Sequence, residues 1–303
     1  MSEPSPHRRR PRYAGKYPRS FEEKYKELDP SKNPETIAKV LASGKTPAGT
    51  HVPIMVAEIL DVLAPKPGET AVDCTLGHGG HARKILERLM PDGHLIGLDV
   101  DPFELPRTES ALRAQGFGAD VFSAYKSNYA GISSALAAHG YAGADVILAD
   151  LGVSSMQLDN PLRGFSNKRP GPLDMRLNPN RGLTAAQWLE RTTPEKLFET
   201  LQENAGEPHA AALASALAGK SFSLTSDLTN AIREVLKARP TEDQDKSVRR
   251  TFQAIRIAVN EEFTALEAFL RALPIALNEG GRVAILTFHS GEDRRVKKYF
   301  QAG

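Results

Sequence analysis

The sequence predicts an α/β protein built on a doubly wound parallel sheet, with a helical domain inserted into it. Between residues 70 and 150, short apolar runs rich in β-formers alternate with helix-compatible windows, a pattern typical of βαβ units. From residue 158 to residue 239 the alternation stops, and only helical patterns follow. A last apolar run comes after Gly280 and Gly281 and returns the chain to the sheet.

The expected strands are short and apolar. They cover residues 70–74, 94–99, 119–124, 145–150 and 282–288, with helices expected at 81–90 and 131–139. Right-handed crossovers place the loops that follow such strands along one edge of the sheet, where ligands bind in folds of this kind.

The inserted segment carries its own helix signals. Helices are expected at 184–191, 194–203, 209–218 and 226–238, followed by one long helix over 252–273. Thr184 and Pro194 stand where an N-cap and a first helical residue are favoured. We therefore expect three parts: a basic N-terminal extension at 1–49 with one helix at 34–42, a discontinuous ligand-binding domain at 50–157 and 246–303, and an inserted helical domain at 158–245 for substrate recognition.

The composition is that of an ordinary globular chain and excludes several classes. Of 303 residues, 40% are hydrophobic and 25% are charged, and no apolar run approaches the ~18 residues of a membrane span. The single cysteine, Cys74, cannot form an internal disulfide, and no Cys/His spacing suggests a metal site. The N-terminus lacks the apolar core of a secretory signal. We expect a cytoplasmic protein with no metal and no membrane partner.

The formal net charge of +2 does not identify a partner, but the charge is unevenly distributed. The first 19 residues hold six Lys or Arg and one Glu. A Pro-rich basic arm of this kind either neutralises phosphates or is a solvated tail.

A glycine-rich turn after the first expected strand indicates a ligand site. The chain continues from Asp73 as C-T-L-G-H-G-G-H, and these glycines let the backbone turn sharply and approach a ligand. Asp99, at the end of the second strand, stands where ribose hydroxyls are bound. Acids at two strand tips suit the cationic ammonium group of S-adenosylmethionine, whereas a pyrophosphate disfavours them. A helix-capping turn without a ligand is the alternative.

The fourth expected strand ends in Asp150, beside the point where the strand order reverses. Because ligands bind at such a switch point, Asp150 is expected to face the reactive end of the cofactor and to hold an amine. In isolation the same carboxylate is also typical of a turn or an N-cap.

Several longer motifs occur along the chain in order. They are H-V-P-I-M-V-A-E at 51–58, D-C-T-L-G-H-G-G-H at 73–81, D-L-G-V-S-S-M-Q-L-D at 150–159, R-G-F-S at 163–166, G-P-L-D-M-R at 171–176, R-T-F-Q-A-I-R-I-A-V-N-E-E at 250–262 and F-H-S-G-E-D-R at 288–294. In these motifs the chain resembles the bacterial RsmH (MraW) family. Its departures include Gly291, where that family usually has Leu, Thr287 in place of Ser, and Pro106, where the family has a continuous helix. The resemblance implies a class I, Rossmann-like methyltransferase that uses S-adenosylmethionine to methylate N4 of a cytidine in 16S ribosomal RNA, in the decoding region of the small ribosomal subunit.

The resemblance also implies site residues. Its cofactor contacts fall on Gly79, Gly80, His81, Asp99, Tyr129, Asp150 and Gln157. For catalysis, Asp150 and nearby backbone carbonyls are expected to accept hydrogen bonds from the cytosine amine, with Ser154 and Asn260 as weaker candidates. A strong general base is not needed, because the nitrogen becomes acidic once it carries positive charge.

RNA contacts are expected from basic side chains that flank the cleft. These are Arg163, Lys168, Arg169, Arg176, Arg249, Arg250 and Arg294. Each basic group alone is more typical of a solvated face, whereas several groups around one cleft favour RNA. Phe165 and Trp188 could stack a base, although Trp188 is more typical of a core residue.

Two other functions stay open from the sequence. The chain could methylate DNA cytosine, a protein or a small molecule, or it could be a non-catalytic ribosome-assembly factor that keeps the fold. The sequence does not decide between a monomer and a homodimer.

Overall fold

The structure is a computed structural model that describes residues 53–302. The basic arm and the helix expected at 34–42 lie outside the described residues. Among residues 53–302, no helix has both the length and the apolar character needed to cross a membrane.

Five parallel strands form one sheet in the order β3-β2-β1-β4-β5. The strands are β1 (Thr70–Asp73), β2 (His94–Asp99), β3 (Phe122–Lys126), β4 (Ala144–Asp150) and β5 (Leu277–Leu286). This order confirms the predicted doubly wound parallel sheet, whose switch point lies between β1 and β4. β3 begins three residues later than expected, and β5 begins before the Gly280–Gly281 pair, with a register shift opposite it.

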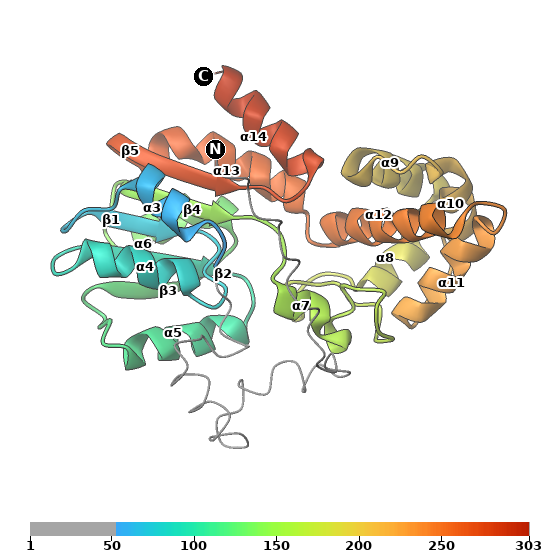
Figure 1. Ribbon diagram of the computed structural model, residues 1–303, viewed down its shortest axis with the longest axis horizontal. Helices are drawn as coiled ribbons and strands as arrows, with labels where there is room; N and C mark the ends of the chain where they lie inside the picture. Colours follow the sequence, from blue (N-terminus) through green and yellow to red (C-terminus); the bar gives the residue numbers. More distant parts are fainter. Residues whose placement is uncertain (1–52, 303) are drawn as a thin grey trace, which may run out of the picture. The chain divides into compact units, whose positions relative to one another are not determined.

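Both faces of the sheet are buried, which explains why its strands are continuously apolar. Side chains alternate between the faces, so that Val72 and Ile147 pack into one core with α6 (Ile132–Ala138) and α13 (Glu262–Ala276). Ala71 and Val146 pack into the opposite core with α3 (Val56–Leu63), α4 (Gly80–Leu89) and α5 (Glu104–Ala114). Figure 1 shows helices on both sides of the sheet, with α14 (Ser290–Ala302) ending the described chain.

The segment after β4 builds a core of its own. Its helices are α7 (Ser155–Asp159), α8 (Ala185–Arg191), α9 (Pro194–Ala205), α10 (Ala210–Leu217), α11 (Thr225–Val235) and α12 (Thr241–Val259). Leu189, Leu201, Leu213 and Ile232 are fully buried in this core, and α12 joins it through Val248. Figure 1 shows α8–α11 gathered around α12. The domain boundary expected at residue 246 therefore falls inside α12.

Several expected helix boundaries differ from those of the structure, most of all in the stretch before the last strand. The single helix expected over 252–273 is two helices, because the chain turns at Asn260 and Glu261, and Glu261 takes a left-handed φ of 52°. The helix expected at 226–238 is α11, which begins at Thr225 and ends at Val235, with Leu224 at its N-cap position. The caps expected at Thr184 and Pro194 are confirmed: Thr184 accepts the N–H of Gln187, and Pro194 is the first residue of α9.

Candidate active site

A cavity of about 1050 Å³ lies at the carboxyl edge of the sheet. Its walls come from the ends of β1, β2 and β4 and from the junction between α12 and α13. The predicted site residues that line it are Gly80, His81, Asp99, Tyr129, Asp150, Ser154, Gln157 and Asn260. The structure thus gathers residues from three of the sequence motifs, together with Asp99 and Tyr129, around one space, at the switch point where such folds bind ligands.

The glycine loop is held in place by carboxylates at the ends of β1 and β2. Asp73 accepts the N–H of Thr75 at 3.0 Å, and Asp99 accepts the N–H of Gly77 at 2.9 Å. The hydroxyl of Thr108 donates to the carbonyl of Gly77. The backbone of the loop is therefore held by the side chains of Asp73, Asp99 and Thr108.

Gly79 has a structural role in this loop. It is the N-cap residue of α4 with φ 72°, in the left-handed region that favours glycine. A Cβ at Gly79 would come within 2.8 Å of the Thr108 methyl group and within 3.4 Å of Leu112. Gly80 lines the cavity and Gly79 does not. A side chain at Gly79 would thus meet α5 behind the loop rather than a ligand in front of it.

The cavity is surrounded by acids. Asp73 is 1% exposed, and its burial raises its pKa to about 6. Burial also raises the pKa of Asp99, with Asp101 and Glu104 adding negative charge beside it. Burial is the main cause of the raised pKa of both carboxylates. A positively charged ligand would stabilise their ionised forms.

Two histidines face these acids. His81 is buried, its Nδ1 lies 3.7 Å from Oδ2 of Asp150, and its Nε2 lies 2.9 Å from the carbonyl of Ile54. The Asp150 backbone N–H donates to the Thr75 hydroxyl at 2.7 Å, which fixes the end of β4 against the glycine loop. His78 lies 3.3 Å from Glu104, and this contact lowers the pKa of Glu104.

Ser154 and Gln157 form a capping box at the start of α7. The Ser154 hydroxyl accepts the Gln157 N–H, and the Gln157 side-chain oxygen accepts the Ser154 N–H at 2.9 Å. The box leaves the Gln157 amide nitrogen directed to Asp101, 3.5 Å away. Both residues therefore shape the cavity wall through contacts with the protein itself.

Asn260 is engaged on both ends of its amide. Its Oδ1 accepts the N–H of Leu177 at 2.7 Å, and its Nδ2 donates to the carbonyls of Met175 and Arg256 at 2.7 and 2.9 Å. These bonds tie the loop after α7 to the end of α12. Asn260 therefore lines the cavity while its side-chain oxygen and nitrogen bind the protein backbone.

Tyr129 closes the cavity from the loop after β3. Its hydroxyl donates to the carbonyl of Glu262 at 3.1 Å, and its ring packs edge-on against Phe269. Burial raises the pKa of Tyr129 well above its usual value. Tyr129 therefore offers the cavity an aromatic surface and no titrating group.

Comparison with known proteins agrees with this geometry. The model of the MraW methylase family matches residues 48–303. The chain belongs to this family. It is therefore a methyltransferase, with the Rossmann-like fold that the sequence predicts.

Curated relatives cover nearly the whole chain. "Ribosomal RNA small subunit methyltransferase H 1" of Agathobacter rectalis is 50% identical over 100% of this chain and 89% of its own length. "Ribosomal RNA small subunit methyltransferase H 2" of Alkaliphilus metalliredigens is 49% identical over 97% of this chain and 86% of its own.

The predicted RNA-binding cations fall into two sets. Arg163 is engaged with Asp101 and with two backbone carbonyls, and Arg176 makes a two-pronged ion pair with Asp174 at 2.8 and 2.7 Å. Lys168, Arg249 and Arg294 are exposed, whereas Arg169 and Arg250 are half-buried. These five do not line the cavity, but Arg181, an exposed residue of the same insertion, does.

The two aromatic candidates also differ. Phe165 is 5% exposed within the core of the insertion, so it has no free face on which a base could stack. Trp188 packs against that core and also lines the cavity. Trp188 therefore has the core contacts expected of it, and base stacking by its ring stays a prediction.

Sequence reasoning missed Asp101 and Glu104. Asp101 is 1% exposed, and its Oδ1 accepts the N–H groups of Phe103 and Glu104 at 3.0 and 3.4 Å. The available signal was the D-V-D-P sequence, in which a second acid follows Asp99 by two residues.

At the last motif, a Cβ on Gly291 would lie 2.5 Å from the Phe263 ring, which explains why a glycine fits there.

Proposed function

We propose that this methyltransferase transfers a methyl group from S-adenosylmethionine to N4 of a cytidine in 16S ribosomal RNA, in the decoding region of the small ribosomal subunit. The observation that carries the proposal is a cavity lined by the acids at the ends of β2 and β4, with the buried Asp73 at the end of β1 close to both, in a chain whose relatives are named small-subunit ribosomal RNA methyltransferases.

The residues present fit the cofactor. S-adenosylmethionine carries a sulfonium and an ammonium cation, and Asp99, Asp150 and the buried Asp73 supply the opposite charge. Asp99 would accept bonds from the ribose, with Gly80 and His81 near the amino-acid end and Tyr129 and Gln157 at the sides. Gly79 would act by fixing the loop. When bound, the cofactor supplies an activated methyl group.

Asp150 is the residue proposed to act on the substrate. Its carboxylate would accept a hydrogen bond from the cytosine amine and hold the nitrogen in line with the methyl group. The contact with His81 keeps this carboxylate oriented, and the bond from the Asp150 N–H to Thr75 fixes its backbone. Ser154 and Asn260 would shape the wall on either side. The target base has to leave its stack, because a paired amine is inaccessible.

The insertion is proposed to recognise the RNA. Residues 158–245 would form this domain, between the two parts of the cofactor-binding domain at 50–157 and 246–303. The exposed and half-buried cations Lys168, Arg169, Arg249, Arg250 and Arg294 would contact phosphates. Arg163 and Arg176 would support the RNA-facing loops from within.

A methyl-transfer assay tests the proposal. Tritium from labelled S-adenosylmethionine should enter isolated small subunits, and nuclease digestion should place it on N4 of a cytidine. Transfer into DNA or protein instead would identify another substrate. Cofactor binding without transfer to any of them would favour an assembly factor.

The variant Asp150→Asn sharpens the test. We expect its single-turnover rate to fall by ~10²-fold, while its affinity for small subunits stays within about threefold, because the lost interaction belongs to the transition state. Asp145→Asn is the matched control, since Asp145 lies at the other end of β4 and binds Thr70 and Asn278. Full turnover in Asp150→Asn would assign Asp150 a purely structural role.

A further inference from the structure

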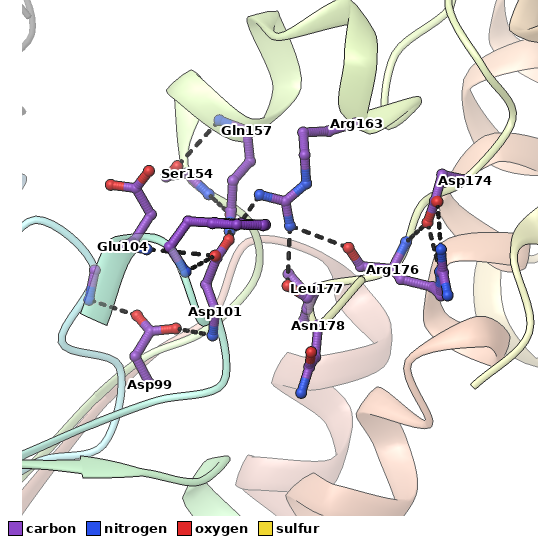
Figure 2. A network of polar contacts seen from close by, with 12 residues as sticks. Asp99, Asp101, Glu104, Ser154, Gln157, Arg163, Asp174, Arg176, Leu177 and Asn178 are labelled. Carbon is purple, nitrogen blue, oxygen red and sulfur yellow. Dashed lines mark hydrogen bonds and ion pairs between the residues drawn. The ribbon is translucent and has the colours of Figure 1, made fainter. Parts of the chain in front are cut away.

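A chain of polar contacts joins the end of β2 to the far wall of the cavity. Asp99 accepts the N–H of Asp101 at 2.8 Å, and the buried carboxylate of Asp101 pairs with Nη1 of Arg163 at 2.7 Å. Figure 2 shows Arg163 between these acids and the loop that contains Leu177. Nη2 of Arg163 donates to the carbonyls of Arg176 and Leu177 at 3.1 and 2.9 Å. One guanidinium thus holds a cofactor-side acid and a substrate-side loop together.

The loop at residues 175–178 is fixed from a second side as well. Asn260 binds the N–H of Leu177 and the carbonyl of Met175. Met175 is fully buried and adopts a left-handed φ of 61°, a conformation that a non-glycine residue keeps only when its surroundings impose it. Leu177 and Asn178 line the same cavity as Asp99. The loop is therefore held in a conformation that the backbone of Met175 disfavours, in the wall of the cavity.

Arg163 is poorly suited to any other role. The side chain of Arg163 is 16% exposed and that of Asp101 is 1% exposed, and the guanidinium is engaged by Asp101 and by the carbonyls of Arg176 and Leu177. A buried carboxylate without its cation would be strongly disfavoured, so Asp101 and Arg163 depend on each other. The planar guanidinium of Arg163 also fixes the relative positions of its partners, because it binds one carboxylate and two carbonyls at once.

We propose that Arg163 is a positioning residue that couples the cofactor-binding edge of the sheet to the substrate-side loop at 175–178. A ligand that binds Asp99 steadies the end of β2, and through Asp101 and Arg163 it steadies the loop. The cofactor and the RNA consequently bind with positive coupling. This proposal rests on the proposed function for the identity of the cofactor.

Hydrogen exchange tests the coupling without RNA or turnover. In the wild-type protein, saturating S-adenosylhomocysteine should slow amide exchange at residues 175–178 by about fivefold or more. In Arg163→Lys, which keeps the charge but loses the fork, we expect this ligand-dependent slowing to fall below about twofold while the affinity for S-adenosylhomocysteine stays within about threefold. Asp101→Asn probes the same pair from the other side and should give the same loss.

Arg282→Lys is the matched control. Arg282 also binds one carboxylate, that of Glu69, together with the carbonyls of Leu63 and Ala64, but it lies at the amino ends of the strands. Its substitution should leave the ligand-dependent slowing at 175–178 unchanged. A second readout is the tightening of small-subunit binding by S-adenosylhomocysteine, which should be lost in Arg163→Lys and Asp101→Asn and kept in the wild type and Arg282→Lys.

Unchanged slowing in both Arg163→Lys and Asp101→Asn would overturn the proposal, and so would a wild-type loop whose exchange ignores the ligand. A loss of ligand affinity beyond about tenfold in Arg163→Lys would instead place Arg163 in the cofactor site itself and would also overturn it. Failure of the proposed function is separate, because it appears as absent methyl transfer by the wild-type protein.

Discussion

At the residue scale, Asp73 holds the glycine loop in place, but the burial of its charge destabilises the folded protein. Its carboxylate accepts the N–H of Thr75, yet it lies close to Asp150 and Asp99 in a site shielded from water. The negative charges of Asp73, Asp99 and Asp150 repel one another, and this repulsion lowers the stability of the folded protein. They also leave the cavity prepared for a cation.

We predict that Asp73→Asn stabilises the protein in a pH-dependent manner. Burial raises the pKa of Asp73 from 3.8 to about 6. The folded state therefore binds more protons than the unfolded state between these values, and stability falls as the pH rises through that window. Asparagine keeps the acceptor for Thr75 and has no charge to bury. The free energy of unfolding should exceed that of the wild type by up to ~3 kcal/mol at pH 7, with little difference near pH 4.

Urea unfolding of both proteins at several pH values measures this difference. Only the difference between the two proteins is informative, because Asp99 also has a raised pKa and titrates in both. If the difference in the free energy of unfolding does not change with pH, the pKa of Asp73 is the same in the folded and unfolded states and its charge does not destabilise the fold.

At the element scale, the junction between α12 and α13 brings distant segments together. α12 belongs to the core of the insertion, and α13 packs on the sheet. The turn between them places Asn260 beside Met175 and Leu177, and it puts Glu261 in the cavity wall with a left-handed φ of 52°. A continuous helix at this point would carry Asn260 away from the loop that it holds.

We predict that Glu261→Gly stabilises the protein, because glycine adopts the left-handed conformation without a steric penalty. The greater freedom of glycine in the unfolded chain offsets part of the gain, so the expected increase in the free energy of unfolding is ~0.5–1 kcal/mol. Glu261→Ala keeps the Cβ and should give no such increase. Equal stabilisation by alanine and glycine in urea unfolding would attribute the effect to the lost carboxylate instead of the backbone.

At the scale of the whole molecule, the position of each cation decides its use. Arg163, Arg176 and Arg256 are turned inward onto Asp101, Asp174 and Glu262. Lys168, Arg249 and Arg294 are exposed. Motif position alone does not separate these sets: the half-buried Arg250 and the inward-facing Arg256 belong to the same motif.

We predict that the double variant Arg249→Ala/Arg250→Ala weakens small-subunit binding and flattens its dependence on salt. Each lost phosphate contact should reduce the magnitude of the slope of log K against log salt concentration by about 0.7–0.9, because fewer counterions are released. Arg233→Ala removes a cation of the insertion that pairs with Asp245, and it should leave the slope unchanged. Filter binding over a range of salt concentrations measures both variants. Equal slopes in the double variant and the wild type would count against RNA contacts on this face.

The sequence by itself determined the features that depend on neighbouring residues. Apolar runs between helix signals located the five strands within a few residues, and the acids at the ends of β1, β2 and β4 were placed because strand ends are local events. Parallel pairing then followed from the alternation of strands and helices. Because the strands are parallel, their carboxyl ends lie along one edge of the sheet, and the cofactor side of the site could be predicted there.

Only the tertiary structure decided which charges meet. Arg163 and Asp101 lie 62 positions apart, and Asn260 binds residues 83 and 85 positions away. No periodicity links such pairs, because their contact depends on how the insertion packs against α12 and on where the chain turns at Glu261. The same holds for Gly79, whose missing Cβ matters through Thr108 on another helix. A cation in a sequence can be read as a phosphate ligand or as a partner for a buried acid, and burial, which the whole fold sets, chooses between them.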